Sequence, residues 1–219
     1  MSGLNPVVSS VRTVLQSSLG RSQLFQELRK YRQRRIYERW LRNERPLPTP
    51  HLHKQLTVRE YARRYRTPVL VETGTYLGEM IEAVKHDFQT IYSIELSREL
   101  HNAALRRFRG SPHVKLWQGD STSVLPSIIA ALESPCLFWL DAHYSAGITA
   151  KGATDTPIVR ELEMIFDAGL GSNVVLIDDA RCFNGDNDYP AIAELESWVH
   201  SRDVSCRFHV EDDIIRINP

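Results

Sequence analysis

Short runs of apolar residues alternate with longer amphipathic stretches from Val69 onwards, and this alternation limits the possible folds most strongly. The apolar runs predict strands at 69–73, 90–95, 114–118, 136–141 and 173–178. The amphipathic stretches predict helices at 77–87, 98–108, 122–132, 156–168 and 189–201. Runs such as Val-Val-Leu-Ile are apolar on both faces, which is typical of parallel strands covered by helices on each side. The pattern therefore predicts an α/β domain with a doubly wound, mostly parallel sheet.

The C-terminal segment 206–218 adds two further predicted strands. They are joined by a turn at Glu211–Asp213, which indicates an antiparallel hairpin at the edge of the sheet. With the five earlier strands this makes a seven-stranded sheet. We assign residues 67–219 to this domain and residues 1–66 to a helical N-terminal extension.

The net charge of zero conceals two oppositely charged parts. Residues 1–66 carry 15 Lys and Arg against 4 acidic residues, a net charge of +11, which leaves −11 for the rest of the chain. A basic arm of this kind could bind nucleic acid, anionic lipid, the acidic domain itself or a second subunit. Residues 22–43 predict one helix with an apolar stripe on a basic surface. The stripe follows the three- and four-residue steps of Leu24, Leu28, Tyr31, Arg35, Ile36 and Trp40.

A proline-rich segment follows this helix. The prolines of 45–53 predict an extended linker, and Thr57–Glu60 has the pattern of a capping box that opens a short helix ending near Tyr65. No apolar run approaches the length of a membrane span, and the first ten residues lack a signal-peptide pattern. The three cysteines, Cys136, Cys182 and Cys206, are widely spaced and odd in number. Together these features predict a cytoplasmic protein without a disulfide framework.

Ligands of open parallel sheets bind beyond the carboxyl ends of the strands, so the residues after each strand are the candidate site. After the first strand, Glu72 is followed by Gly74 and Gly78, which permit a tight turn and a close approach of the backbone. Glu95 ends the second strand, roughly 20 residues after the glycines. An acid at that spacing usually binds ribose hydroxyls. After the third strand, Asp120 could accept a hydrogen bond from adenine or could cap the next helix.

The fourth and fifth strands end in acidic residues. Asp141 follows one, and Asp178 and Asp179 follow the other. Three neighbouring carboxylates repel one another, and a divalent cation with oxygen ligands, Mg²⁺ rather than Zn²⁺, would relieve the repulsion. The alternatives are neutralisation by Arg181 or Lys151, or a role of some of these acids as helix caps.

These segments, in this order, resemble the class I S-adenosylmethionine-dependent methyltransferases. The resemblance rests on VETGTYLGEM, IYSIEL, WQGDS, WLDAH and LIDDAR and covers roughly residues 68–219. The two aspartate-bearing strand ends look like those of the Mg²⁺-dependent O-methyltransferases of catechol, caffeoyl-CoA and macrocin type. The resemblance implies a Rossmann-like methyltransferase fold, S-adenosylmethionine as cofactor, and Mg²⁺ held by Asp141, Asp178 and Asp179.

Roles are carried over position by position. The implied cofactor-binding residues are Glu72, Gly74, Tyr76, Gly78, Glu95, Leu96, Gly119, Asp120, Ser121 and Asp141. The lysine that catechol-type enzymes carry three residues past the first metal aspartate is absent, because Tyr144 stands there. The general base is therefore open among His143, Tyr144, Lys151 and Asp141.

The function expected from these features is metal-assisted methylation of a small hydroxylated molecule. The segment 143–156 is expected to close over the substrate as a loop. A homodimer through the N-terminal helices is one expected arrangement of the arm, and no membrane partner is expected. Two alternatives stay open: a methyltransferase that binds nucleic acid through its basic arm, and a protein that keeps the fold without catalysis.

Overall fold

The computed structural model describes residues 23–141, 156–169 and 171–219, and side chains from Glu27 onwards. The strands are β1 (Val69–Thr73), β2 (Thr90–Glu95), β3 (Val114–Gln118), β4 (Cys136–Leu140), β5 (Val174–Ile177), β6 (Arg207–Glu211) and β7 (Ile214–Asn218). The helices are α2 (Gln23–Arg42), α3 (His51–Tyr65), α4 (Glu79–Val84), α5 (Arg98–Arg107), α6 (Ser121–Ala130), α7 (Ile158–Asp167) and α8 (Ile192–Arg202), with a short 3₁₀ turn, η2 (Ala180–Cys182).

The strands form one seven-stranded sheet in the order β3-β2-β1-β4-β5-β7-β6. The pairs from β3 to β5 are parallel, whereas β7 is antiparallel to both β5 and β6. The order reverses between β1 and β4, which lie side by side although two strands separate them in the chain. The predicted fold class is confirmed, and the reversal marks the place where ligands of such sheets bind.

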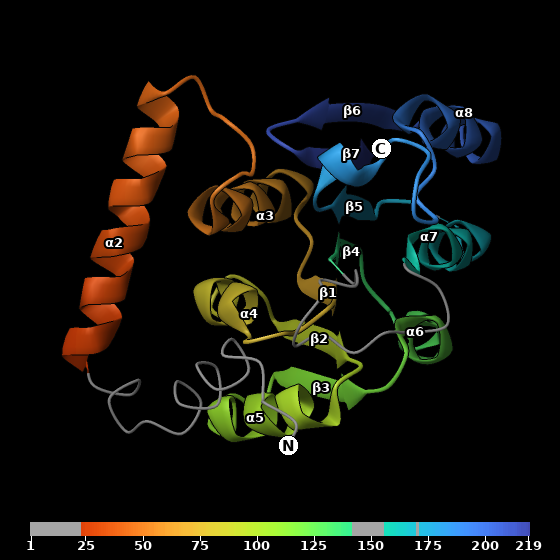
Figure 1. The fold of residues 1–219 in the computed structure, drawn as a ribbon. Coiled ribbons are helices and arrows are strands. Elements are labelled where there is room, and N and C mark those ends of the chain that lie inside the picture. Colours follow the sequence, from red (N-terminus) through yellow and green to blue (C-terminus); the bar gives the residue numbers. More distant parts are fainter. Residues whose placement is uncertain (1–22, 142–155, 170) are drawn as a thin grey trace, which may run out of the picture.

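Helices cover both faces of the sheet (Figure 1). α3, α4 and α5 lie on one face, over a core that includes Val58, Ile81, Phe108 and Trp139. α6, α7 and α8 lie on the other face, over a second core formed by residues such as Phe138. β4 is buried along its whole length, as its apolar run predicted.

The start of α3 corrects the reading of the proline-rich segment. The helix begins at His51, directly after Pro50, whose φ of −65° already suits a helix start. Thr57 is therefore a buried residue inside the helix rather than a cap. The predicted linker was too long by three residues because proline is compatible with a position at the helix N-terminus. Val58, Tyr61 and Ala62 of α3 belong to the core, so this part of the N-terminal extension packs on the sheet.

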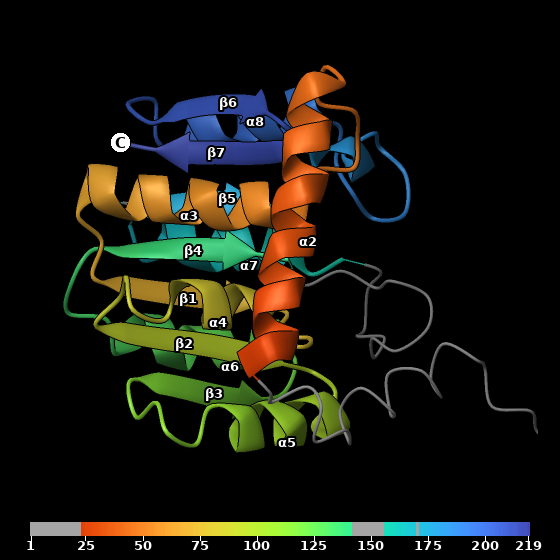
Figure 2. The ribbon, with the colours of Figure 1, turned by 90° about the vertical axis from the view of Figure 1, so that its left-hand side faces the viewer.

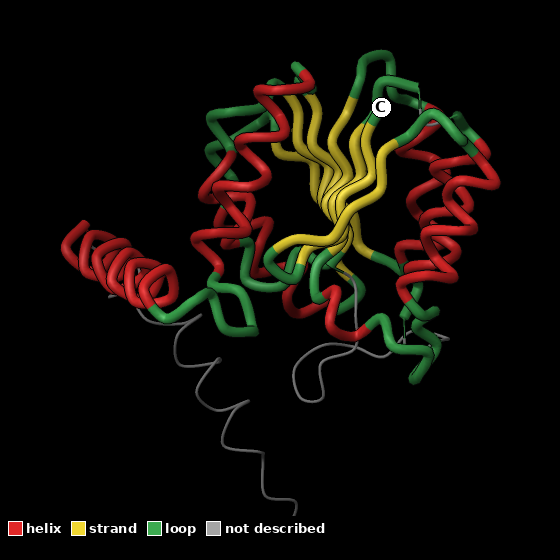
Figure 3. The backbone as a smooth tube through the Cα atoms, turned by 90° about the horizontal axis from the view of Figure 1, so that it is seen from above, coloured by secondary structure: helices red, strands yellow, loops and turns green. Residues whose placement is uncertain are grey.

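α2 lies outside the layer of α3 and α4, as seen along two further directions (Figures 2 and 3). Of the predicted apolar stripe, Trp40 is buried, whereas Leu28, Tyr31 and Ile36 are exposed. Apart from Trp40, the stripe does not face the domain, because the side chains of Gln33 and Tyr37 turn inwards in place of the other stripe residues.

The C-terminal end of α2 is held by the turn of the β6–β7 hairpin. Arg45 and His53 both contact the Asp212 carboxylate at 3.0 Å, and the Thr49 hydroxyl donates a hydrogen bond to the Asp212 carbonyl. The Trp40 ring packs on His53 with 4.8 Å between ring centroids. None of the helices in the described ranges has the length and apolar composition needed to cross a membrane. All three cysteines are free thiols, and two of them are buried.

Candidate functional site

The loop after β1 bends over the end of β2. The backbone N–H groups of Gly74 and Thr75 both donate to the Ile94 carbonyl, at 3.0 and 3.1 Å. Gly74 and Gly78 have φ angles of 89° and 69°, in the region that favours glycine. A side chain at Gly78 would also meet the Phe108 ring, since a Cβ placed there lies 2.6 Å from Cε2. The two glycines therefore allow both the turn and the close packing of α4 against α5.

Glu95 lies directly against this loop. Its Oε2 accepts the N–H of Tyr76 at 2.7 Å, and its Oε1 accepts the N–H of Ser97 at 2.8 Å. Burial raises the pKa of Glu95, while the backbone hydrogen bonds oppose the shift. Leu96, the next residue, accepts a hydrogen bond from Gln118 through its carbonyl. The structure thus brings Glu95 together with the Gly74–Gly78 loop, as the sequence predicted.

Glu72 lies beneath the loop. It is 2% exposed, and its Oε2 accepts a hydrogen bond from the Ser93 hydroxyl. The Ser93 oxygen is in turn 2.6 Å from the Thr75 hydroxyl. Burial raises the pKa of Glu72 to about 8. This chain of three side chains fixes the loop to β1 and β2 from below.

The turn after β3 lies beside the end of β2. The Gly119 N–H donates to the Glu95 carbonyl at 3.0 Å. Asp120 caps α6, because its Oδ1 accepts hydrogen bonds from the N–H and the hydroxyl of Thr122 at 2.8 and 2.6 Å. The capping alternative for Asp120 is therefore realised, while a role in binding adenine stays a prediction. Ser121 is buried and interacts with Glu161 of α7.

Glu161 is a buried acid that the sequence analysis missed. It has no exposed surface, and its Oε2 accepts a hydrogen bond from the Thr73 hydroxyl at 3.3 Å. Burial raises the pKa of Glu161 to about 7, and the Ser121 and Thr73 hydroxyls offset part of that shift. Glu161 thus joins the end of β1 to the start of α6.

The acidic strand ends come together as predicted. Asp141 N–H donates to the Thr73 carbonyl, and Asp178 N–H donates to the Leu140 carbonyl, so the ends of β1, β4 and β5 are tied side by side. Asp178 and Asp179 are buried. Asp179 has a φ of 56°, which is unusual for a residue with a side chain.

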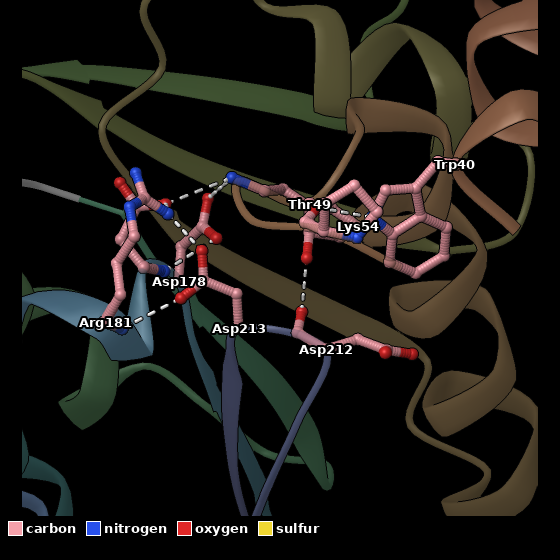
Figure 4. A network of polar contacts seen from close by, with 9 residues as sticks. Trp40, Thr49, Lys54, Asp178, Arg181, Asp212 and Asp213 are labelled. Atoms are coloured by element: carbon pink, nitrogen blue, oxygen red, sulfur yellow. Dashed lines mark hydrogen bonds and ion pairs between the residues drawn. The ribbon is translucent and has the colours of Figure 1, made fainter. Parts of the chain in front are cut away.

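The cation that meets these carboxylates is Lys54 of α3 (Figure 4). Its Nζ donates to Asp178 Oδ2 at 2.5 Å and to Asp179 Oδ1 at 3.4 Å. Arg181 Nη1 donates to the same Asp179 oxygen at 2.7 Å and also pairs with Asp213. Neutralisation by Arg181 is thus confirmed, and Lys54 was missed.

The pKa values of Lys54 and Asp178 follow from burial and from the neighbouring charges. Burial favours the neutral amine of Lys54, but Asp178 and Asp179 outweigh it, so the pKa of Lys54 is raised. Burial and the neighbouring Asp141 raise the pKa of Asp178, and Lys54 opposes this shift. Lys54 therefore keeps its proton and its charge.

The three aspartates do not fit the predicted Mg²⁺ site. A magnesium ion needs carboxylate oxygens at roughly 2.0–2.1 Å in near-octahedral geometry. The ammonium of Lys54 already lies 2.5 Å from Asp178 Oδ2, in the space that such an ion would need. Within the described ranges, no three His, Cys, Asp or Glu side chains are grouped so as to hold a metal ion.

Three candidate bases lie outside the described residues: His143, Tyr144 and Lys151, together with most of the predicted loop 143–156. Asp141 is described. His51, which the sequence analysis passed over, lies near the same cluster. Partial burial and the charge of Lys54 lower its pKa, whereas Asp141 raises it.

The spacing of residues along the sequence could have revealed His51 and Lys54 as candidate site residues. His51, Lys54, Gln55 and Val58 recur at three- and four-residue steps, so they share one face of a helix that begins at 51. Placing that helix start at Thr57 concealed the pattern.

The comparison with solved structures bears on the fold, whereas two comparisons of the sequence found no match. No family model matches the sequence, and no curated protein matches it. Among solved structures, the chain is similar to the O-methyltransferase TomG from Streptomyces achromogenes in complex with SAM, at 14% identity and a TM-score of 0.56, over 85% of this chain and 88% of that one.

Two further structures are similar. The SAH-bound methyltransferase PaMTH1 from Podospora anserina has 16% identity and a TM-score of 0.56, over 100% of this chain and 97% of that one. An O-methyltransferase from Bacillus cereus in complex with SAH has 11% identity and a TM-score of 0.54, over 85% of this chain and 90% of that one. The chain thus has the fold of the class I S-adenosylmethionine-dependent methyltransferases, as its sequence predicted.

Proposed function

We propose that this protein is an S-adenosylmethionine-dependent methyltransferase that acts on a hydroxyl oxygen of a small molecule. The observation that carries the proposal is the position of Glu95 against the Gly74–Gly78 loop, at the point where the strand order reverses. The shared fold with the O-methyltransferases above supports it.

The side chains at the carboxyl ends of β1 and β2 suit an adenosyl cofactor. Each Glu95 oxygen accepts one backbone N–H, and a carboxylate oxygen has a second lone pair that can accept a ribose hydroxyl. The Gly74–Gly78 loop brings backbone atoms close to the cofactor without a side chain at either glycine. Glu72 and Ser93 hold that loop in place from below, so little ordering is needed on binding.

S-adenosylmethionine supplies a methyl group on a sulfonium; its C–S bond breaks as the new C–O bond forms, leaving S-adenosylhomocysteine. The protein must hold the acceptor oxygen in line, about 3–3.5 Å from the methyl carbon. It must also accept the hydroxyl proton, and Asp141, at the end of β4, is the described candidate for that step.

Isothermal calorimetry with S-adenosylmethionine tests the proposal. We expect binding at micromolar cofactor, and a loss of at least about tenfold for Glu95→Gln, since a hydrogen bond to a charged acceptor is worth roughly 1.5–3 kcal/mol. Glu99→Gln is the matched control, because Glu99 is exposed on the first turn of α5. Absence of binding at millimolar cofactor would leave a protein with this fold and no methyl transfer.

A second candidate is a methyltransferase that binds nucleic acid through α2. The observation in its favour is a row of exposed arginines on the outer side of the helix: Arg32, Arg35, Arg39 and Arg42. They recur at three- and four-residue steps, so they lie on one face, and their charges suit a phosphate backbone.

Fluorescence anisotropy with a labelled single-stranded RNA of mixed sequence distinguishes this candidate. Binding through the row should weaken steeply with salt, and changing all four arginines to alanine should reduce the slope of log K against log salt by about 3. A charge-matched control changes exposed arginines elsewhere: Arg64, Arg66, Arg98 and Arg106. Equal losses in both variants would argue against a specific role of α2.

A further inference from the structure

The carboxylates that end β5 are already paired with a cation of the chain itself. Lys54 is 8% exposed, and its Nζ lies 2.5 Å from Asp178 and 3.4 Å from Asp179. The lysine enters from α3, whose position is fixed by Val58, Tyr61 and Ala62 in the core. The Lys54 side chain therefore reaches the carboxylates from a helix that is part of the core.

We propose that the Lys54 ammonium takes the place of a divalent cation in this crevice, so that the acceptor oxygen is held without a metal. The proposal rests on the proposed methyl transfer and specifies how that site holds its acceptor. It also explains why the aspartates at these strand ends do not fit the expected Mg²⁺ site.

Geometry and charge both oppose a metal ion here. A Mg²⁺ ligated by Asp178 would lie roughly 2.1 Å from a carboxylate oxygen, close to the ammonium already bound there. Two cations so close together repel strongly in a buried site. Arg181 also occupies Asp179 Oδ1 at 2.7 Å, so the oxygens of this pair carry two positive partners before any ligand arrives.

Holding the acceptor with an ammonium instead of a metal ion limits which acceptors fit. A metal aligns a substrate by binding two of its oxygens, whereas an ammonium offers separate N–H donors. Among the described residues, Lys54 gives two of its three N–H donors to Asp178 and Asp179. One donor is left, which suits an acceptor presenting a single oxygen rather than a pair of adjacent hydroxyls.

The test measures Mn²⁺ binding to the full-length protein, because Mn²⁺ reports on Mg²⁺ sites and its free form is read directly by electron paramagnetic resonance. We expect the wild type to leave Mn²⁺ free at concentrations up to about 100 µM, corresponding to a Kd weaker than that value. Lys54→Met vacates the carboxylates and should gain Mn²⁺ affinity by at least about tenfold. Lys30→Met, at an exposed lysine of α2, is the control.

The Lys54→Met variant leaves buried carboxylates unpaired and so risks misfolding. The double variant Lys54→Met with Asp178→Asn removes a charge on each side, and it should fold without gaining Mn²⁺ affinity. Wild-type Mn²⁺ binding tighter than about 100 µM that is lost in Asp178→Asn would overturn the proposal. A folded Lys54→Met variant with no gain in affinity would overturn it as well.

These measurements need no methyl transfer, so they fail independently of the proposed function, which cofactor calorimetry tests. Once an acceptor is known, turnover should be the same in EDTA and in Mg²⁺. A loss of turnover in EDTA, restored by Mg²⁺, would contradict the role of Lys54.

Discussion

Replacing Glu161 by glutamine should make the stability of this protein less dependent on pH. Glu161 is wholly buried, and burial raises its pKa from 4.5 to about 7. The native state therefore holds the proton between those two pH values, whereas the unfolded state releases it. The stability contributed by this group is fully present below pH 4.5 and is lost as the pH rises to about 7.

The magnitude follows from the size of that shift. A difference of one pKa unit corresponds to about 1.4 kcal/mol, so the rise from 4.5 to about 7 corresponds to about 3 kcal/mol. No reduction for solvent screening is needed, since the side chain has no exposed surface. Glutamine cannot ionise. Relative to the wild type, Glu161→Gln should therefore gain about 3 kcal/mol in free energy of unfolding between pH 4.5 and pH 8.

Urea unfolding followed by circular dichroism at several pH values provides the measurement. Glu72 and Glu95 also have raised pKa values, so the difference between variant and wild type must be compared, not each curve alone. Glu163→Gln is the matched control, because Glu163 lies on the same helix and is exposed. A difference that stays constant from pH 4.5 to pH 8 would refute the reasoning.

Three further predictions follow from other parts of the structure. Gly78→Ala should lower the free energy of unfolding by about 1–3 kcal/mol in urea melts, because of its φ of 69° and the Phe108 ring 2.6 Å from the new Cβ; Gly110→Ala, with open space around it, should have little effect. Asp212→Asn should make the region around the end of α2 exchange its amide hydrogens faster, since it weakens the ion pair with Arg45 and the contact with His53, and unchanged exchange would contradict that anchoring role. If the protein dimerises through its N-terminal helices, Leu28→Glu on the exposed side of α2 should shift sedimentation velocity to the monomer; a wild-type monomer would exclude that arrangement.

The strands could be predicted closely because burial on both faces leaves a direct signature. The runs around Val71, Phe138 and Val175 are apolar without alternation, and each predicted strand agrees with the observed one to within one residue at either end. The approach of Glu95 to the Gly74 turn could be predicted as well, because parallel strands end at one edge of the sheet.

The partner of the aspartates could not be predicted in the same way. Lys54 and Asp178 are 124 residues apart, and no periodicity links them. The three prolines before His51 also favoured an extended segment, although Pro50 stands where proline is compatible with a helix start. Glu161 was missed for a different reason. An acid on an amphipathic helix is normally exposed, and only the packing of α7 shows that this one is enclosed.

The turn of the C-terminal hairpin has two neighbouring acids that bind different parts of the chain. Asp212 holds Arg45 and His53 of the N-terminal extension, while Asp213 holds Arg181 beside the aspartates of β5. A single turn thus holds both the N-terminal extension and the segment that follows β5. Deleting either aspartate would leave a single acid in the turn for the partners of both. A change in the N-terminal extension would then also affect Arg181, and the reverse. Loop grafting in this protein should therefore spare that turn, even though it lies far from the glycine loop in the chain.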